Sequence, residues 1–297
     1  MGAKSLFSFL KNCATIRKTS KKGDGKMHVT VLAENTAARD GLVAEHGLSL
    51  FIETNGQAIL CDGGQSDALL SNAAALKKDL SAVDVAVLSH GHYDHSGGIS
   101  ALAKTYPQIP IFLRAEAGGD YFHDERYIGI DKTLVACPNC RAIADVGVTK
   151  LGETLSVFSG FGNDFPRPCA NEGLTVRDKA GERPDDFCHE QAAVVEEDGK
   201  RVLVSGCAHS GILNVLARFT ALYGGVPDAV FSGFHTAKLD PYTPAEIAEL
   251  QALAEALAKT GATLYTGHCT GDAAFDVMKP ILGDRLVRIR CGDSFQL

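Results

Sequence analysis

The sequence predicts an α/β protein in which helices cover β-sheets. Two observations give this fold class. Short apolar runs rich in β-branched residues alternate along the chain with segments whose apolar residues recur at helical spacing. In addition, 45% of the 297 residues are hydrophobic, which is enough for a substantial core. A third observation concerns function, because several of the apolar runs lead directly into a histidine.

The first half of the chain contains five predicted strands, at residues 28–32, 48–53, 58–61, 83–88 and 109–114. The second and third strands form a hairpin, because Asn55-Gly56 between them favours a tight turn. Helical spacing predicts two helices, at residues 66–80 and 99–106. Ser66 is the expected N-cap of the first helix.

In the second half, residues 192–205 are predicted to form two strands around a Glu-Asp-Gly turn. Further helices and strands are expected at residues 214–223, 228–231, 244–259 and 262–265. Strands of this half are followed by His209, His235 and His268. Because strand C-termini in a layered α/β fold converge on one edge, we expect these histidines to share a site with His90.

A dense run of metal-ligand side chains follows the strand at residues 83–88. It contains His90, His92, Asp94 and His95. Extended chain would place alternate side chains of this run on one side, and a following turn would direct Asp94 and His95 towards a second position. Gly97 and Gly98 are expected to let the chain turn sharply into the next helix. Imidazoles with one carboxylate suit zinc, manganese or iron.

This run resembles the HxHxDH signature of the metallo-beta-lactamase superfamily. Six further segments resemble a subgroup, the 7,8-dihydropterin-6-methyl-4-(beta-D-ribofuranosyl)aminobenzene-5'-phosphate synthase-like proteins: ENT (34–36), EHGLS (45–49), CDGGQS (61–66), SGCAHSG (205–211), SGFH (232–235) and HCTG (268–271). The resemblance extends over residues 28–297 and implies a four-layer αββα sandwich. It also implies a site for two divalent metal ions, for which zinc is the first choice and manganese or iron the alternatives.

A catalytic metal keeps about three protein ligands and leaves a position for water. We therefore divide the predicted ligands into His90, His92 and His209 for the first ion, and Asp94, His95 and His268 for the second. Water or hydroxide is expected to bridge the two ions. Two cations close together would lower the pKa of that water.

The sequence departs from the superfamily pattern at two positions. The usual third histidine falls near His189-Glu190, so Glu190 is an alternative ligand or a supporting residue. The usual bridging Asp or Cys falls at Cys207. If Cys207 bridges, His209 supports the site from outside; if His209 is a ligand, Cys207 packs as a buried thiol. We favour His209, because hard oxygen chemistry does not require a thiolate.

The resemblance assigns roles to other residues around the ligands. Asp62 would hold a metal-bound imidazole by its other nitrogen. His235 falls where related phosphodiesterases carry a proton donor, so we predict a general acid there, with Asp94 as the second catalytic residue. Four residues in the first long loop are predicted to line the substrate pocket: Glu34, Asn35, Glu45 and His46.

The predicted function is a dinuclear-metal-dependent hydrolase that attacks a small phosphorylated or otherwise electrophilic substrate through a metal-bound hydroxide. One alternative is a synthase that joins a dihydropterin methyl group to an aminobenzene ribofuranosyl phosphate. Another is a non-catalytic metal-binding sensor. The net charge of -7 gives no basic footprint for nucleic acid, and no apolar stretch is long enough to span a membrane. A small-molecule substrate is therefore expected.

Residues 1–26 are predicted to be a flexible N-terminal extension, with Met27 as an alternative start, and residues 27–297 to be one domain. Residues 115–190, rich in Gly, Pro, Asp and Cys, are predicted to contain a substrate-facing insertion. Nine cysteines without a secretory signal predict a reducing, cytoplasmic location. One further zinc site is considered, formed by Cys137, Cys140, Cys169 and Cys188.

Overall fold

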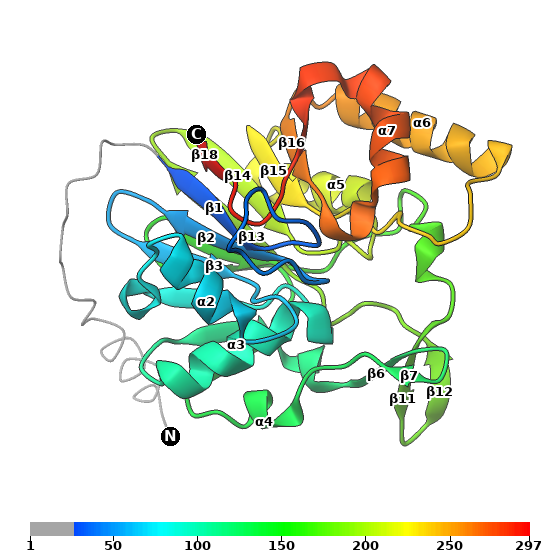
Figure 1. Ribbon diagram of the computed structural model, residues 1–297. Helices are drawn as coiled ribbons and strands as arrows, with labels where there is room; N and C mark the ends of the chain where they lie inside the picture. Colours follow the sequence, from blue (N-terminus) through cyan, green and yellow to red (C-terminus); the bar gives the residue numbers. More distant parts are fainter. Residues whose placement is uncertain (1–26) are drawn as a thin grey trace, which may run out of the picture.

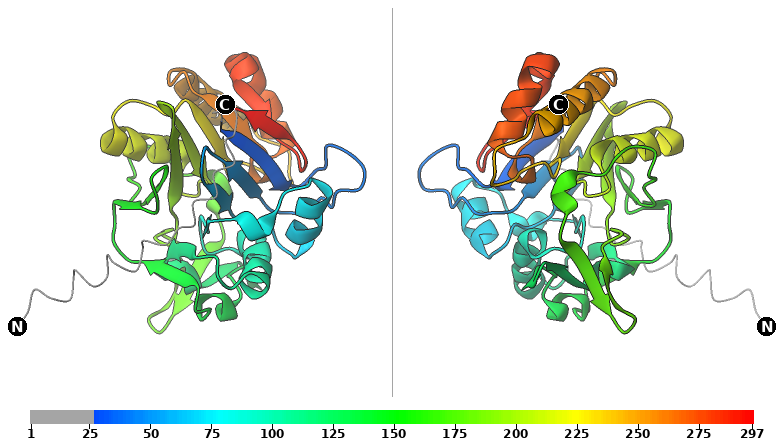
Figure 2. Two further views of the ribbon diagram at one scale, coloured as in Figure 1. Left: turned by 90° about the vertical axis from the view of Figure 1, so that its left-hand side faces the viewer. Right: turned by 90° about the vertical axis from the view of Figure 1, so that its right-hand side faces the viewer.

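The computed structural model describes residues 27–297, which form four layers (Figures 1 and 2). Two seven-stranded sheets pack face to face, and helices cover the outer face of each. The α/β class and the four-layer αββα arrangement are therefore confirmed. The extension predicted at residues 1–26 lies outside the described residues. Within residues 27–297, no helix is both long enough and apolar enough to cross a membrane.

The first sheet consists of β1 (His28–Ala33), β2 (Ser49–Glu53), β3 (Ala58–Cys61), β4 (Val85–Val87), β5 (Ile111–Arg114), β8 (Cys140–Ile143) and β18 (Ser294–Gln296). Its strand order is β18-β1-β2-β3-β4-β5-β8. The outer face is covered by α2 (Ala68–Ala75), α3 (Tyr93–Thr105) and α4 (Lys132–Val135). The predicted hairpin is present, because β2 and β3 pair in antiparallel register from Leu50 with Cys61 to Glu53 with Ala58.

The second sheet consists of β9 (Val148–Lys150), β10 (Leu155–Phe158), β13 (Ala192–Glu197), β14 (Lys200–Ser205), β15 (Ala229–Ser232), β16 (Thr263–Thr266) and β17 (Leu286–Arg288). Its strand order is β17-β16-β15-β14-β13-β10-β9. Its outer face is covered by α5 (Ile212–Tyr223), α6 (Pro244–Ala258) and α7 (Asp272–Leu282). Thr243 begins α6 with a capping box to Glu246, which satisfies backbone N–H groups of the first turn.

Alternating apolar residues of the two inner faces form the central core. Val29 and Val87 of the first sheet, and Val204 and Phe231 of the second, belong to this cluster and are at most 3% exposed. Both sheets are antiparallel on one side and parallel on the other, with β3-β4-β5-β8 and β14-β15-β16-β17 parallel. The C-terminal ends of the parallel strands therefore lie at one edge of the sandwich, and the loops that follow them meet there.

A third, four-stranded sheet lies beside the two main ones, at the lower right of Figure 1. Its strands are β6 (Asp120–His123), β7 (Arg126–Tyr127), β11 (Leu174–Asp178) and β12 (Gly181–Pro184), in the order β12-β11-β6-β7. Residues 115–190 thus divide: β8 joins the first sheet, β9 and β10 join the second, and the other strands form the third sheet.

Two helices differ most from their predicted bounds. The first, α2, ends at Ala75 rather than residue 80, because Lys77 adopts a positive φ of 58° that no helix continues through. Its N-cap is Asp67 rather than Ser66. The second, α3, begins at Tyr93 rather than residue 99. The last two residues of the metal motif therefore lie in the first turn of a helix.

The predicted turn at Gly97-Gly98 is wrong, because both glycines lie inside α3. A Cβ atom at Gly97 would overlap the backbone oxygen of Gln65, and one at Gly98 would overlap that of Gly63. The Gly97 N–H donates to the Gly64 oxygen at 3.0 Å. The glycines thus permit close contact between the helix and the loop after β3.

Candidate metal centre

The predicted ligands meet at the edge where the parallel strands end. The loop after β4 carries His90 and His92, the loop after β14 carries Cys207 and His209, and His268 follows β16. Together with Asp94 and His95, these residues form two adjoining groups of potential ligands.

The first group consists of His90, His92 and His209, whose candidate ligand atoms lie within 4.8 Å of one another. These side chains are at most 4% exposed. The Nε2 atom of each is buried and has no hydrogen-bond partner in the described chain. Three buried imidazole nitrogens without partners at one point fit a metal ion, which would satisfy all three.

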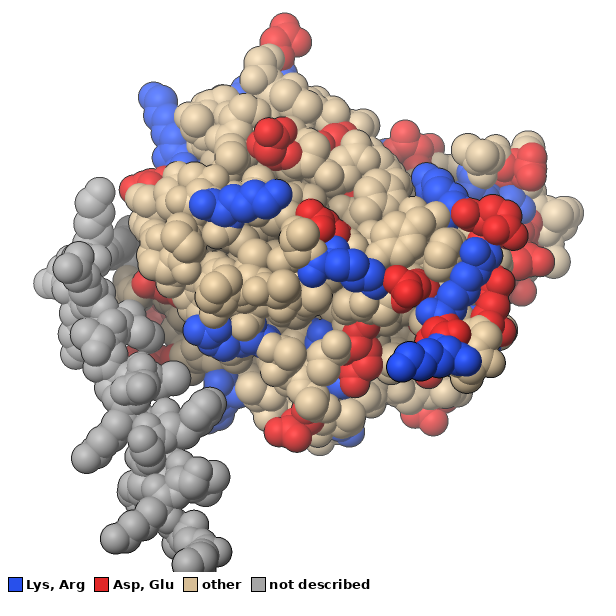
Figure 3. Space-filling model, turned by 90° about the horizontal axis from the view of Figure 1, so that it is seen from below, with Lys and Arg blue, Asp and Glu red and all other residues tan. Residues whose placement is uncertain are grey.

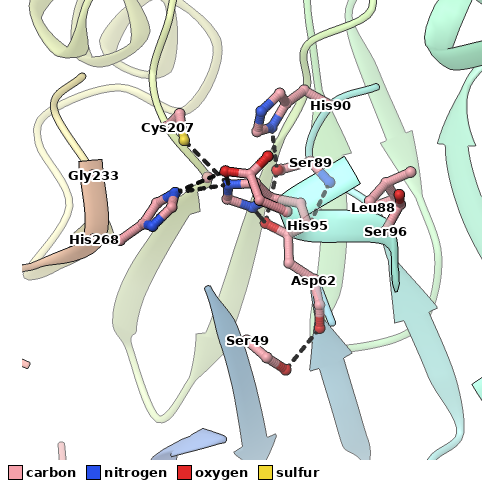
Figure 4. A network of polar contacts seen from close by, with 12 residues as sticks. Ser49, Asp62, Leu88, Ser89, His90, His95, Ser96, Cys207, Gly233 and His268 are labelled. Atoms are coloured by element: carbon pink, nitrogen blue, oxygen red, sulfur yellow. Dashed lines mark hydrogen bonds and ion pairs between the residues drawn. The ribbon is translucent and has the colours of Figure 1, made fainter. Parts of the chain in front are cut away.

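The other ring nitrogens of His90 and His95 are held by a relay that starts at Asp62 (Figure 4). Asp62 Oδ2 accepts from His95 Nδ1 and from the Ser89 hydroxyl, each at 2.7 Å. Since the Ser89 hydrogen is used in this way, Ser89 Oγ accepts from His90 Nδ1 at 2.8 Å. Both imidazoles therefore carry hydrogen on Nδ1 and present the Nε2 lone pair to the centre.

Two asparagines set the same tautomer in the two remaining loops. Asn171 Oδ1 accepts from His209 Nδ1 at 3.0 Å, and its amide group donates to the His209 carbonyl at 2.8 Å. Asn35 Oδ1 accepts from His268 Nδ1 at 2.9 Å. Four of the five predicted imidazole ligands thus have their Nε2 lone pair available to a metal.

The second group consists of Asp94, His95, Cys207 and His268, again with candidate ligand atoms within 4.8 Å. His95 Nε2 lies 3.1 Å from Cys207 Sγ and 3.3 Å from His268 Nε2. Asp94 Oδ2 lies 3.2 Å from His268 Nε2 and 3.8 Å from His95 Nε2. A carboxylate, two imidazoles and a thiol converge, which fits a second borderline divalent ion.

Cys207 and His209 can contribute to different ligand groups in this arrangement. Cys207 Sγ belongs to the second group, while His209 Nε2 belongs to the first. From the sequence, the two residues are alternatives, because the bridging Asp or Cys of the superfamily pattern falls at Cys207. Ala208, between them, has a positive φ of 52°, so the backbone turns sharply between the two ligand residues.

Burial keeps the first group neutral. It is the main cause that lowers the pKa of His90 and His209 well below the usual range, and neighbouring imidazoles lower these values further. The pKa of His92 falls to about 3 for the same main reason. A neutral imidazole is the form that binds a metal, so these residues need not lose a proton first.

The second group has a different electrostatic character. Burial alone would lower the pKa of His95, but the carboxylates of Asp62 and Asp94 outweigh it and raise that pKa to about 9. Burial alone would raise the pKa of Asp94, but His95, His268 and His46 outweigh it and lower that pKa well below its usual range. This part of the centre therefore favours a positive charge, either a proton or a metal cation.

Glu190 and His189 are placed to support the ligands. The Glu190 carboxylate accepts from the backbone N–H groups of His209 at 2.7 Å and Ser210 at 2.9 Å. His189 Nδ1 accepts from the Gly91 N–H at 2.9 Å, and its Nε2 donates to Asp185 at 3.0 Å. Because their polar atoms are used in this way, both residues fix the loops that carry ligands.

The four residues predicted to line the substrate pocket divide into two pairs. Asn35 and His46 line a cavity of about 190 Å³ at the centre, with His46 Nε2 3.3 Å from Asp94 Oδ2. Glu34 and Glu45 do not line this cavity. Glu34 accepts from the backbone N–H of His268 at 2.6 Å, and Glu45 accepts from Gln65 and Ser66 of the loop after β3. Both buried carboxylates hold the protein's own loops.

His235 also lines the cavity, and its ring centroid lies 4.0 Å from that of His209. Its Nε2 donates to the Ala170 carbonyl at 3.2 Å. Its Nδ1 is buried and has no hydrogen-bond partner in the described chain. His235 is also close enough to Cys207 and His209 to form a third possible ligand group with them. The predicted role as general acid stays a prediction.

Cys137, Cys140, Cys169 and Cys188 do not occur in any of the potential metal-ligand groups within residues 27–297. Three residues outside the predicted site hold the ligand imidazoles or their neighbours: Ser89, Asn171 and Asp185. Ser89 directly precedes His90, and this position next to the motif is the one sequence signal that could have indicated its supporting role. Asn171 and Asp185 lie far from the ligands in sequence and carry no motif.

Comparison with known proteins agrees with this geometry. The family model of the metallo-beta-lactamase superfamily, whose members are typically metal-dependent hydrolases, matches residues 42–268. An uncharacterized protein of Methanocaldococcus jannaschii is 30% identical over 214 residues, which are 70% of this chain and 78% of that protein. A 7,8-dihydropterin-6-methyl-4-(beta-D-ribofuranosyl)-aminobenzene-5'-phosphate synthase of the same organism is 26% identical over 296 residues, covering 89% and 94% of the two chains.

The crystal structure of Tm1679, a metal-dependent hydrolase of the beta-lactamase superfamily, is similar with a TM-score of 0.78 and 27% sequence identity. The similarity covers 91% of this chain and 99% of that one. The family model covers more than half of the sequence, and the fold agrees with it. The chain therefore belongs to the metallo-beta-lactamase superfamily.

Proposed function

We propose that this protein is a hydrolase that uses two divalent metal ions to cleave a small phosphate ester. The observation that carries the proposal is the convergence of five imidazole Nε2 atoms with the Asp94 carboxylate and the Cys207 thiol in two adjoining groups. Divalent ions held there would lower the pKa of water and, by polarising a phosphoryl oxygen, make the phosphorus more electrophilic. Zinc suits these donors, and manganese or iron are alternatives.

The protein's own residues would orient the ligands and supply a proton. Asp62, Ser89, Asn171 and Asn35 hold the imidazoles in one tautomer, so the ligand atoms are preorganised. We assign the leaving-group proton to His235. Because its Nε2 hydrogen is donated to Ala170, the proton that it can release is the one on Nδ1. Transfer of that proton to the departing oxygen leaves a neutral imidazole.

A small substrate is supported by the size of the cavity and by the surface. A cavity of about 190 Å³ holds a reacting phosphate and a part of its substituents rather than a polymer. On the face shown in Figure 3, Lys and Arg side chains are interspersed with Asp and Glu. Such a surface lacks the continuous basic footprint that nucleic acid binding requires.

The general-acid role predicts a dependence on the leaving group. A His235→Gln variant should lose roughly 10²–10⁴-fold in kcat on phosphodiesters with poor alkoxide leaving groups. It should lose little on bis(4-nitrophenyl) phosphate, because 4-nitrophenolate departs without protonation. The measurement is kcat for both substrates, with metal content determined in the same samples. Equal losses on both substrates at unchanged metal content would contradict the role, and no hydrolysis of any phosphoester by the metal-loaded wild type would contradict the proposed function.

A second candidate is favoured by the relative named as a dihydropterin-linked synthase, which matches nearly the whole chain. In that reaction an arylamine, rather than water, would be the nucleophile. Incubation of the metal-loaded protein with a 6-hydroxymethyl-7,8-dihydropterin diphosphate and an aminobenzene ribofuranosyl phosphate separates the two. Formation of the joined product supports the synthase, whereas release of the hydrolysed dihydropterin alone supports the hydrolase.

A further inference from the structure

One arginine of the third sheet lines the metal cavity without an acidic partner. Arg126, in β7, lies on the cavity wall together with His92 and His209. Within residues 27–297 it takes part in no ion pair, although Asp124 and Glu125 precede it directly in the turn. Its positive charge is therefore not neutralised by the residues next to it.

The acidic side chains around Arg126 are already used by other groups. Glu125 pairs with Arg177 at 3.3 Å, and Arg177 also pairs with Glu182 at 3.0 Å. The other arginine of this sheet, Arg183, pairs with Asp178. Arg126 is thus the one arginine of the third sheet, β6, β7, β11 and β12, that lacks a carboxylate within the described chain.

The cavity does not neutralise this charge either. Asp94 is the only acidic residue on its described wall, and Asp94 Oδ2 lies 3.3 Å from His46 and 3.2 Å from His268. Arg126 is the only lysine or arginine there. Its guanidinium lies 5.7 Å from the ring centroid of Tyr93, which keeps it beside the cavity wall.

Apolar side chains lie next to Arg126 in the same wall. Ile128, two residues further along the chain, and Leu174 of β11 both line the cavity and belong to the small core of the third sheet. The metal ligands, an apolar surface and an exposed guanidinium thus share one cavity. These three features fit a molecule with a reacting phosphate, an apolar body and a second anionic group.

We propose that Arg126 binds a second, non-reacting anionic group of the substrate, a carboxylate or a phosphate, and so determines which phosphate esters the protein accepts. The inference rests on the proposed function, because it names the substrate class of the same site. A guanidinium binds either anion through two parallel charge-assisted hydrogen bonds. Ile128 and Leu174 would contact the apolar body between the two anionic groups.

Binding of phosphonates tests this inference without turnover. The probes are benzylphosphonate, 4-carboxybenzylphosphonate and 1,4-xylylenebisphosphonate, none of which is hydrolysed. Isothermal titration of the metal-loaded wild type should give a Kd at least roughly tenfold lower for one or both of the doubly anionic probes than for benzylphosphonate. Which probe gains affinity identifies the anion as carboxylate or phosphate.

The Arg126→Ala variant should lose this difference, while its Kd for benzylphosphonate stays within about twofold of the wild type, because the metal ligands are unchanged. Arg183→Ala is the matched control, since it removes an arginine of the same sheet that does not line the cavity, and it should keep the difference. Equal affinity of the wild type for all three probes, no measurable binding of any, or a difference that survives in Arg126→Ala would overturn the inference. Binding that follows this pattern without phosphoester hydrolysis would overturn only the proposed function.

Discussion

Replacing His95 by alanine is expected to lower kcat/KM by more than the roughly 10–100-fold that is typical when a residue supporting a metal ligand is removed. His95 is fully buried, and its Nε2 lies 3.1 Å from Cys207 Sγ and 3.3 Å from His268 Nε2. Its removal would therefore take away the imidazole at the middle of the second ligand group. It would also leave the buried carboxylate of Asp62 without its imidazole partner.

The measurement is kcat/KM together with metal content, and circular dichroism to establish that the variant folds. Asp62→Asn provides a graded comparison, because it keeps every ligand but removes the carboxylate that accepts from His95 Nδ1 and from the Ser89 hydroxyl. We expect that variant to fall within the roughly 10–100-fold range. A folded His95→Ala variant with wild-type metal content and wild-type kcat/KM would show that the second group does not hold a catalytic metal.

Replacing Gly98 by alanine is expected to destabilise the fold by about 1–3 kcal/mol or more, although Gly98 lies inside a helix. Helix propensity alone predicts the opposite sign, because alanine is about 1 kcal/mol more favourable than glycine in a helix interior. The reason for the reversal is a backbone contact. A Cβ atom at Gly98 would overlap the backbone oxygen and carbon of Gly63, which are not the ends of a flexible side chain.

Urea unfolding of Gly98→Ala measures this effect, with Gly56→Ala as the control. A Cβ atom at Gly56, in the turn of the β2–β3 hairpin, would meet no heavy atom within 4 Å, so the control should change the free energy of unfolding by no more than about 0.5 kcal/mol. The Gly98→Ala variant should also bind metal more weakly. The reason is that the Gly63 N–H donates to the carbonyl of His95, a predicted ligand, at 2.8 Å, so a shift of Gly63 would disturb that ligand. An increase in stability would show that α3 moves away from the loop without cost.

Short-range patterns in the sequence predict part of the fold and most of the candidate ligands. Apolar runs located nine of the 18 strands within residues 27–297, and each strand that leads into a histidine placed that residue at the common edge. The two sets of three predicted ligands, His90 with His92 and His209, and Asp94 with His95 and His268, are brought together as two groups. The position of each histidine after a predicted strand contains this information, because the C-terminal ends of parallel strands converge.

The remaining parts depend on long-range packing. Gly97 and Gly98 favour a turn when read locally, but the close approach of α3 to the loop after β3 requires them in a helix. The helix α7 contains Pro280 in its last turn, a residue that argues against a helix in sequence. Glu34 and Glu45 have charged side chains that could bind a substrate. Their carboxylates instead accept hydrogen bonds from backbone N–H groups of the protein. The hydrogen-bond partner of a buried carboxylate depends on the folded structure and cannot be read from the sequence around it.

The central claim is that the protein holds two metal ions, and elemental analysis tests it most directly. The protein should be purified anaerobically without added metal, beside a His92→Ala variant that removes one ligand of the first group. We predict about two equivalents of zinc, manganese or iron in the wild type and a clear loss in the variant. No bound metal in the wild type, even after reconstitution with each of these ions, would contradict the claim and with it both the hydrolase and the synthase.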